Sequence, residues 1–183
     1  MRMMHADVSR PYFFAKAVRP VYVELPEKDK EFGDQNKCGR LVMSMYGTRD
    51  AAINWSDECT KTLVKDGYKQ GRANLCLFWH PSKKADVMVH GDDFVALGSD
   101  ESLKSTMRSL EEKYKIKVQV LGPDEEQEIS ALNKIIRWTP EGIELEADPR
   151  HAGIVIKELG ARRQGDQGAR SQSTKRRTGR GKY

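Results

Sequence analysis

Two short apolar runs, at residues 87–89 and 94–97, meet at a polar centre, residues 90–93 (His-Gly-Asp-Asp). Apolar runs of this length that are interrupted by Gly and Asp are typical of a β-hairpin, here with its turn at residues 91–93. Adjacent carboxylates at a hairpin tip repel each other unless a positive group, usually a divalent cation, offsets their charge. The pattern predicts a hairpin with a candidate cation site at its tip, although a solvated Asp-Asp turn is the more common occurrence.

Apolar spacing also predicts two helices on either side of this hairpin. The first can be capped by Asp50 and ended by Gly67, and its apolar face comprises Ala51, Trp55, Cys59 and Leu63. The second can be capped by Ser99 or Asp100, and its apolar face comprises Leu103, Met107, Leu110 and Tyr114. We expect Trp55 to lie in the core of its helix rather than to contact a ligand.

Strands and a third helix account for most of the remaining pattern. Strands are predicted at residues 3–8, 21–25, 74–79 and 116–120, and a hairpin across 135–138 and 143–145. A third helix is predicted to begin at Asp148-Pro149 and to end at Gly160. Antiparallel strands with inserted helices indicate an α+β fold, with an antiparallel sheet and helices packed on one face.

Composition divides the chain at about residue 160. Residues 1–160 suit one domain with a core, whereas residues 161–183 have no apolar periodicity and are predicted to form a disordered tail. The tail carries eight Lys or Arg and one Asp, a net charge of +7, which leaves −2 for residues 1–160 out of the total of +5. A basic tail attracts phosphate backbones weakly and with strong salt dependence.

The cysteine pattern and the hydropathy indicate the cellular compartment in which the protein is expected. Cys38, Cys59 and Cys76 are odd in number and form no C-x-x-C pair, which argues against a disulfide framework or a zinc site and favours a reducing intracellular setting, cytoplasmic or nuclear. No apolar run approaches the roughly 18 residues of a membrane span. The N-terminus has no apolar stretch of the kind that a secretory signal requires.

Asp7 is a candidate third acid, because it ends the first predicted strand. If that strand neighbours the hairpin, Asp7, Asp92 and Asp93 converge on one edge of the sheet. Hard cations such as Mg²⁺ bind oxygen ligands, and one or two carboxylates plus substrate phosphates make a site. Spacing alone leaves this convergence open.

Several motifs, in order, resemble those of a known family. Residues 7–13 (DVSRPYF) are similar to the first catalytic motif of reverse transcriptases, in which an Asp is followed five residues later by Tyr or Phe, and residues 90–93 occupy the place of their aromatic-x-Asp-Asp motif. Residues 41–55 are similar to the LYGLKQAPRxW signature of copia-type retrotransposon polymerases. Residues 21–26 (VYVELP) and 67–78 resemble two further copia-type segments, VYMEQP and GF…DPCLF. The resemblance covers residues 5–160 and identifies a copia-type LTR retrotransposon reverse transcriptase, a piece of a Pol polyprotein.

This resemblance implies a fold and an activity. The fold is the reverse transcriptase palm with part of the fingers, and the activity is RNA-directed DNA polymerisation by two-metal nucleotidyl transfer. The partners are an RNA template, a DNA primer and dNTPs, and no membrane. The parent polyprotein would add integrase and RNase H, which are absent here.

The resemblance also implies roles for individual residues. Asp7 and Asp92 would be the principal ligands of Mg²⁺, with Mn²⁺ as the alternative, and Asp93 would complete the acidic cluster. Tyr12 would be the aromatic gate under the sugar of the incoming nucleotide, although without the family a core aromatic beside Phe13 and Phe14 is the simpler interpretation. Asp50 occupies the place of a nucleotide-contacting Gln.

The sequence departs from the family at several of these positions. Pro11 replaces the usual Ala and stiffens the backbone beside Tyr12. An acid at position 50 faces a triphosphate unfavourably, so Asp50 is also interpreted as a helix cap only. Six residues precede Asp7, so we expect the upstream fingers strands and their basic residues to be missing.

Three alternatives to an active reverse transcriptase remain open. One is a non-catalytic transposon relic that at most binds nucleic acid through its tail. A second is a Gly-Asp-Asp RNA-dependent RNA polymerase, against which Tyr12 and the segment at 41–55 argue. A third is a metal hydrolase that uses His5, His90 and the acids. Outside that alternative, His90 either contacts the primer end or fills space in the hairpin. His5 and His151 then have no assigned role.

Overall fold

The computed structural model describes residues 1–34, 36–146 and 149–159. The chain divides into two compact units, Met1–Leu145 and Glu146–Tyr183. In the second unit the described part is the helix α3 (Pro149–Glu158), on which Ile154, Val155 and the following Leu159 are exposed. The predicted helix end at Gly160 and the predicted tail at 161–183 lie outside the described residues.

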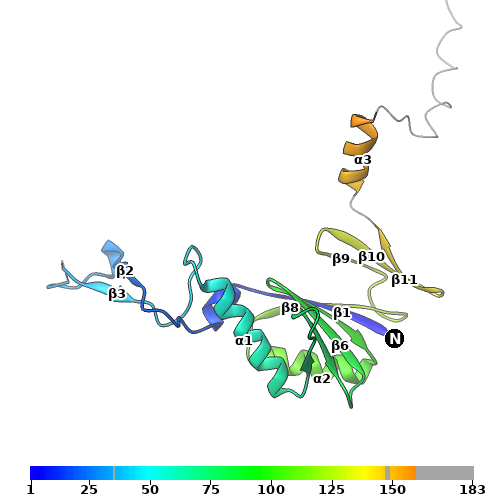
Figure 1. Ribbon diagram of the computed structural model, residues 1–183, viewed down its shortest axis with the longest axis horizontal. Helices are drawn as coiled ribbons and strands as arrows, with labels where there is room; N and C mark the ends of the chain where they lie inside the picture. Colours follow the sequence, from blue (N-terminus) through cyan, green and yellow to red (C-terminus); the bar gives the residue numbers. More distant parts are fainter. Residues whose placement is uncertain (35, 147–148, 160–183) are drawn as a thin grey trace, which may run out of the picture. The chain divides into compact units, whose positions relative to one another are not determined.

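The first unit is built on a six-stranded antiparallel sheet (Figure 1). Its strands, in spatial order, are β4 (Lys69–Gln70), β5 (Leu77–His80), β6 (Ala85–His90), β7 (Asp93–Gly98), β1 (Arg2–Val8) and β8 (Ile116–Leu121). The first strand of the chain therefore lies between β7 and β8, inside the sheet. This placement makes β1 a direct neighbour of the predicted hairpin, which is β6–β7.

Two helices cover one face of this sheet, as the sequence predicted. They are α1 (Ala51–Lys65) and α2 (Asp100–Glu111). Alternate residues of β1 point into the core beneath them, and the cluster there includes Met4, Ala6, Val8, Trp55, Cys59, Leu63, Phe94, Leu103 and Leu110. Alternation with a period of two is what directs one set of side chains of each strand to this core and the other set to the opposite face of the sheet. The mixed α+β fold with antiparallel strands is thus confirmed.

A small three-stranded sheet packs beside the other face of the large sheet. Its order is β11 (Gly142–Glu146), β10 (Lys134–Thr139) and β9 (Glu128–Ala131). Met3 of β1 and Leu121 of β8 share a buried cluster with Ile129, Ala131 and Ile136 of this small sheet. The predicted hairpin across 135–145 is confirmed, whereas β9 and β4 were not predicted.

Two elements differ from their predicted bounds by more than one residue. The strand expected at 74–79 begins only at Leu77, because Asn74 Oδ1 accepts from the Cys76 N–H and the Asn74 carbonyl from the Leu77 N–H, which forms a turn. The second helix ends at Glu111, so Tyr114 lies beyond it, although Tyr114 is buried at 3% exposure. Its start is as predicted, since the Ser99 hydroxyl accepts from the Ser102 N–H.

A two-stranded ribbon, β2 (Tyr22–Glu24) with β3 (Cys38–Arg40), joins β1 to the α1 region. A short 3₁₀ turn, η2 (Glu27–Asp29), lies between its strands. Cys38, Cys59 and Cys76 are free cysteines, and of the three only Cys59 is buried. Within the described ranges, no helix is long and apolar enough to cross a membrane.

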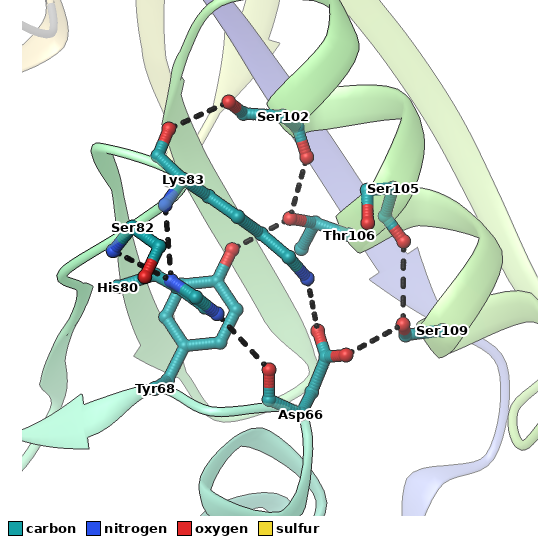
Figure 2. A network of polar contacts seen from close by, with 9 residues as sticks. All are labelled: Asp66, Tyr68, His80, Ser82, Lys83, Ser102, Ser105, Thr106 and Ser109. Carbon is teal, nitrogen blue, oxygen red and sulfur yellow. Dashed lines mark hydrogen bonds and ion pairs between the residues drawn. The ribbon is translucent and has the colours of Figure 1, made fainter.

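A polar network holds the end of α1 against the β5–β6 turn and α2 (Figure 2). The Asp66 carboxylate pairs with Lys83 Nζ at 3.2 Å and accepts from Ser109 Oγ at 3.1 Å. The Nδ1 atom of His80 accepts from the backbone N–H of Ser82 and of Lys83, so the ring proton is on Nε2, which donates to the Asp66 carbonyl at 3.2 Å. Three elements are thereby tied together at the end of the sheet away from the hairpin tip.

Gly67 ends α1 in the way the sequence predicted. Its N–H donates to the Val64 carbonyl and the Tyr68 N–H donates to the Leu63 carbonyl, which is the Schellman arrangement. Gly67 has a φ of +94°, and a Cβ there would lie 2.8 Å from His80 Nε2. Both the backbone conformation and the space favour glycine.

Gly67→Ala should therefore lower the free energy of unfolding by about 2–4 kcal/mol, through left-handed strain plus the clash with His80. Gly47→Ala is the matched control, because Gly47 has a φ of +88° and a Cβ added there would meet nothing within 4 Å, so this change should cost about 1–2 kcal/mol. Urea denaturation measures both values. Equal losses in the two variants would show that His80 adds nothing to the strain.

Candidate active site

Asp7 and Asp93 lie directly opposite each other on neighbouring strands. The register pairs Asp7 of β1 with Asp93 of β7, and the Val8 N–H donates to the Asp92 carbonyl at 2.9 Å. In an antiparallel ladder this pattern makes Asp7 and Asp93 a pair without mutual hydrogen bonds, in which the Cα atoms are about 4.5 Å apart and the side chains are close. The condition set by the sequence, that the two strands be neighbours, is met.

The turn at the hairpin tip is one residue shorter than predicted. His90 pairs with Asp93, so the turn is Gly91-Asp92 and Asp93 belongs to β7. Gly91 has a φ of +63°, which suits glycine at the first central position of a two-residue hairpin turn. The three acids are thus divided between two strands and the turn that follows β6.

His5 offsets part of the charge on Asp93. Its Nε2 atom lies 2.7 Å from Asp93 Oδ1, and His5 is 8% exposed. Because an ionised carboxylate only accepts, the ring proton of His5 is on Nε2. Two carboxylates directly opposite each other are destabilising, and this contact compensates one of them.

The carboxylates of Asp7 and Asp92 are available to bind a cation. Across the described residues, neither takes part in a hydrogen bond or an ion pair within the chain. No group of three or more His, Cys, Asp or Glu side chains in that part of the chain is arranged to hold a metal ion. Two oxygen donors suit a hard cation that keeps its waters and arrives with substrate phosphates, and they do not form a complete protein cage.

The same finding bears on the hydrolase alternative. His5 is bonded to Asp93, and His90 is exposed at the end of β6. The described residues contain no cluster that combines both histidines with the acids. The geometry that the hydrolase interpretation required is therefore not found in this part of the chain.

Tyr12 lies next to this acidic edge, in the short 3₁₀ helix η1 (Pro11–Phe14). Pro11 is at the first position, where its fixed φ and missing N–H are tolerated, so this departure from the family fits the local structure. The ring centroid of Tyr12 lies 4.5 Å from that of Tyr46. Tyr12 is half-buried against the main core, which is compatible with either interpretation made from the sequence.

The segment before α1 is fixed beside η1 by buried polar contacts. The Ser44 N–H donates to the Ala15 carbonyl at 2.7 Å, and Asn54 Nδ2 donates to Ser44 Oγ at 3.0 Å. Ser44 is 1% exposed, so these bonds are protected from water. They place Tyr46, which is 49% exposed, next to Tyr12.

Tyr46 is electrostatically coupled to the acids. Partial burial, followed by the negative charge of Asp92, raises the pKa of the Tyr46 phenol; Asp7 acts in the same direction and Arg10 in the opposite one. Arg10 is exposed and has a left-handed conformation, φ 56° and ψ 57°, immediately before η1. The acidic edge therefore has an aromatic and a cationic neighbour.

Asp50 takes the helix-cap position without the capping bond. It precedes α1, but its side chain accepts no hydrogen bond from the first turn. Its carboxylate lies 3.5 Å from Arg19 Nη2. Partial burial raises the pKa of Asp50, but its backbone N–H and Arg19 outweigh this effect, so the net shift is downward. Asp50 thus has the capping position that was predicted, whereas the predicted capping bond is not formed.

A cavity of about 220 Å³ adjoins the hairpin tip. Its walls include Tyr12, Trp55, Phe78, Val89, His90 and Gly91. Trp55 is 3% exposed, as expected for a core residue, and its indole Nε1–H also donates to the Gly91 carbonyl at 2.6 Å. The helix spacing predicted the burial but gave no sign of this bond.

Sequence reasoning missed several residues of the site. His5 had no assigned role, although its position two residues before Asp7 on a strand puts both on the same face, which was the available signal. Tyr46 was noted only as part of a motif. Its contact with Tyr12 depends on long-range packing, which spacing does not reveal.

Asp92→Asn should lower the pKa of Tyr46, because removing a nearby negative charge makes the phenolate less unfavourable. Titration of ¹³Cζ-labelled tyrosines by NMR measures this value, and Tyr46→Phe assigns the signal. Asp124→Asn, at an exposed position in the β8–β9 turn, is the control and should leave the pKa of Tyr46 unchanged. An unchanged pKa of Tyr46 in the Asp92→Asn variant would contradict the proximity of the two side chains.

Comparison with known proteins identifies the family of this chain. The family model for "Reverse transcriptase (RNA-dependent DNA polymerase)" matches residues 1–127. Two similar relatives from Saccharomyces cerevisiae are the truncated transposon Ty1-A Gag-Pol polyprotein and the transposon Ty1-DR5 Gag-Pol polyprotein; each is 24% identical over 123 residues, which is 66% of this chain. The chain spans 10% and 7% of their respective lengths. With a family match over more than half of its residues, the chain belongs to the reverse transcriptase family, in the copia-type retrotransposon branch.

Proposed function

We propose that residues 1–145 form the palm, with part of the fingers, of an RNA-directed DNA polymerase, and that the Asp7 edge is its nucleotidyl-transfer site. The observation that carries the proposal is the register of β1 with β7, which brings Asp7 opposite Asp93 and beside the Gly91-Asp92 turn. Family membership supports the reaction class.

Asp7 and Asp92 are the residues proposed to hold the divalent cation. Neither carboxylate has a partner among the described residues, and the backbone bond from the Val8 N–H to the Asp92 carbonyl ties the turn to the residue that follows Asp7. These two residues would hold Mg²⁺, or Mn²⁺ in its place, and with a second ion the metal would supply activation of the attacking hydroxyl and stabilisation of the leaving oxygen in an in-line displacement. The protein holds the two ligands on a rigid strand and a short turn.

Asp93 has a different part in this proposal. Its bond to His5 keeps one carboxylate oxygen occupied, so Asp93 adds negative charge beside the ligands and is less available as a ligand itself. His5 fixes the orientation of Asp93 in turn. The pair sets the charge of the edge and leaves Asp7 and Asp92 open to the substrate side.

The aromatic pair Tyr12–Tyr46 is proposed to form the floor beneath the sugar of the incoming nucleotide. The rings are 4.5 Å apart and adjoin the acids, so a nucleotide whose phosphates reach the cation has its sugar near them. A fixed ring in this place crowds a 2′-hydroxyl and favours deoxyribonucleotides. Asp50 is proposed to contact the nucleotide only through Arg19, because that cation offsets an acid facing a triphosphate.

The polymer substrates follow from the family. We propose an RNA template and a DNA primer as partners, and a parent polyprotein that supplies integrase and RNase H. The relatives are Gag-Pol polyproteins of much greater length, which supports this organisation. Nucleic-acid binding by a non-catalytic relic is the outcome that remains if incorporation fails.

Asp7→Asn and Asp92→Asn should each lower Mg²⁺-dependent dNTP incorporation on a primed RNA template by at least about 100-fold, because each removes a proposed cation ligand. Asp86→Asn is the matched control: Asp86 is exposed on β6, in the same hairpin, at the end away from the tip. It should retain activity within about twofold.

Folding of every variant is checked by circular dichroism and by its urea midpoint. Activity that persists in Asp92→Asn would overturn the site. A folded wild-type chain without incorporation would overturn the activity of this chain while leaving its family membership intact.

Tyr12→Val should increase the use of ribonucleotides relative to deoxyribonucleotides by roughly tenfold or more, because the smaller side chain leaves room for a 2′-hydroxyl. The ratio of kcat/KM for rNTP and dNTP measures the effect. Phe13→Val, at an exposed position in the same 3₁₀ helix, is the control. An unchanged ratio in Tyr12→Val would leave Tyr12 as a packing residue only.

A further inference from the structure

The Gly91-Asp92 turn is held at two consecutive carbonyls by two different elements. The Gly91 carbonyl accepts from Trp55 Nε1 of α1 at 2.6 Å, and the Asp92 carbonyl accepts from the Val8 N–H of β1 at 2.9 Å. In a two-residue hairpin turn the ladder is closed by the flanking pair, here His90 and Asp93, so the carbonyls of the turn need partners outside it.

Fixing both carbonyls fixes the peptide planes on either side of the Asp92 Cα. A free two-residue turn can rock about its flanking strands, and such motion displaces the side chain at its tip. With the carbonyls of Gly91 and Asp92 bonded, the base of the Asp92 side chain is held relative to Val8, which follows Asp7 directly. The separation of the two carboxylates therefore depends on the indole of Trp55.

The Trp55 ring has little freedom to move. It is 3% exposed and makes edge contacts with Tyr114 at 5.1 Å and with Phe94 at 6.4 Å between ring centroids. Tyr114 is fixed in turn, since its hydroxyl lies 2.6 Å from Thr62 Oγ1. A donor on so rigid a ring defines the position of its acceptor, which is what a preorganised site requires.

We propose that Trp55 is a positioning residue of the active site, which sets the place of the Asp92 carboxylate relative to Asp7 through its indole N–H. The inference about the turn stands on these contacts alone; its consequence for catalysis rests on the proposed polymerase function. Burial by itself does not account for the bond, because a Phe at position 55 would fill much of the same space without a donor.

The test distinguishes the effect of the Trp55 indole N–H from the effect of the volume that the ring fills. Trp55→Phe removes the N–H and part of the ring, and replacement of Trp55 by 3-benzothienylalanine exchanges the N–H for sulfur while keeping the bicyclic shape. Trp79→Phe is the matched control, because Trp79 is 45% exposed on β5, away from the tip. Amide hydrogen exchange of Val8, followed by NMR, reports directly on the bond to the Asp92 carbonyl.

Both variants at position 55 should accelerate exchange of the Val8 amide by roughly five- to tenfold, the effect of losing about one hydrogen bond, and should leave the Tyr68 amide at the end of α1 unchanged. Mn²⁺ binding should weaken in the same two variants, so the Mn²⁺ concentration at half-saturation should rise. Trp79→Phe should change neither quantity. An unchanged Val8 amide in the benzothienylalanine variant, or equal acceleration of all core amides, would overturn the proposal.

The exchange measurement needs neither metal nor activity. If the wild-type chain binds no Mn²⁺ and incorporates no nucleotide, the polymerase proposal fails while the Val8 amide still decides whether Trp55 positions the turn. If Mn²⁺ binds but the position-55 variants bind it as the wild type does, the positioning role fails and the polymerase proposal stands.

Discussion

The antiparallel pairing of β1 with β7 is the interaction on which the rest of this molecule depends. It places the first strand of the chain inside the sheet, with β8 on its other side, so β1 joins the hairpin to the remainder of the fold. The same pairing sets Asp7 against Asp93, which opposes two negative charges at a closely spaced position. The apolar side chains of β1 are buried under the helices, and this burial offsets the repulsion.

Stability and the candidate chemistry are therefore coupled through one register. Met4, Ala6 and Val8 point into the core, while His5 and Asp7 point to the other face. A slip of one residue would bury Asp7 and expose the apolar set, so the core itself selects the arrangement in which the acids meet. The buried contacts of Trp55 and Ser44 extend this constraint to the hairpin tip and to Tyr46.

The residue pattern correctly predicted the elements that are determined by interactions between residues close in sequence. The helix over 51–65 with its glycine end, the Ser99 cap and the hairpin at 87–97 followed from spacing and turn chemistry. The Asn74 turn and strand β9 were missed, because a side-chain hydrogen bond and a sheet neighbour decided them. Asp50 contacts the distant Arg19, and the contact of His5 with Asp93 joins residues 88 positions apart. Such contacts depend on tertiary packing, which a periodicity does not encode.

The most direct test of the central claim, that Asp7 and Asp92 hold a divalent cation at one edge of the sheet, is anomalous diffraction from crystals of the full chain grown with Mn²⁺ and a dNTP. If Asp7 and Asp92 hold the cation, a manganese peak will lie within coordination distance of both carboxylates, beside the Gly91-Asp92 turn. A peak bound by other residues, or Asp7 and Asp92 carboxylates too far apart to share an ion, would contradict it.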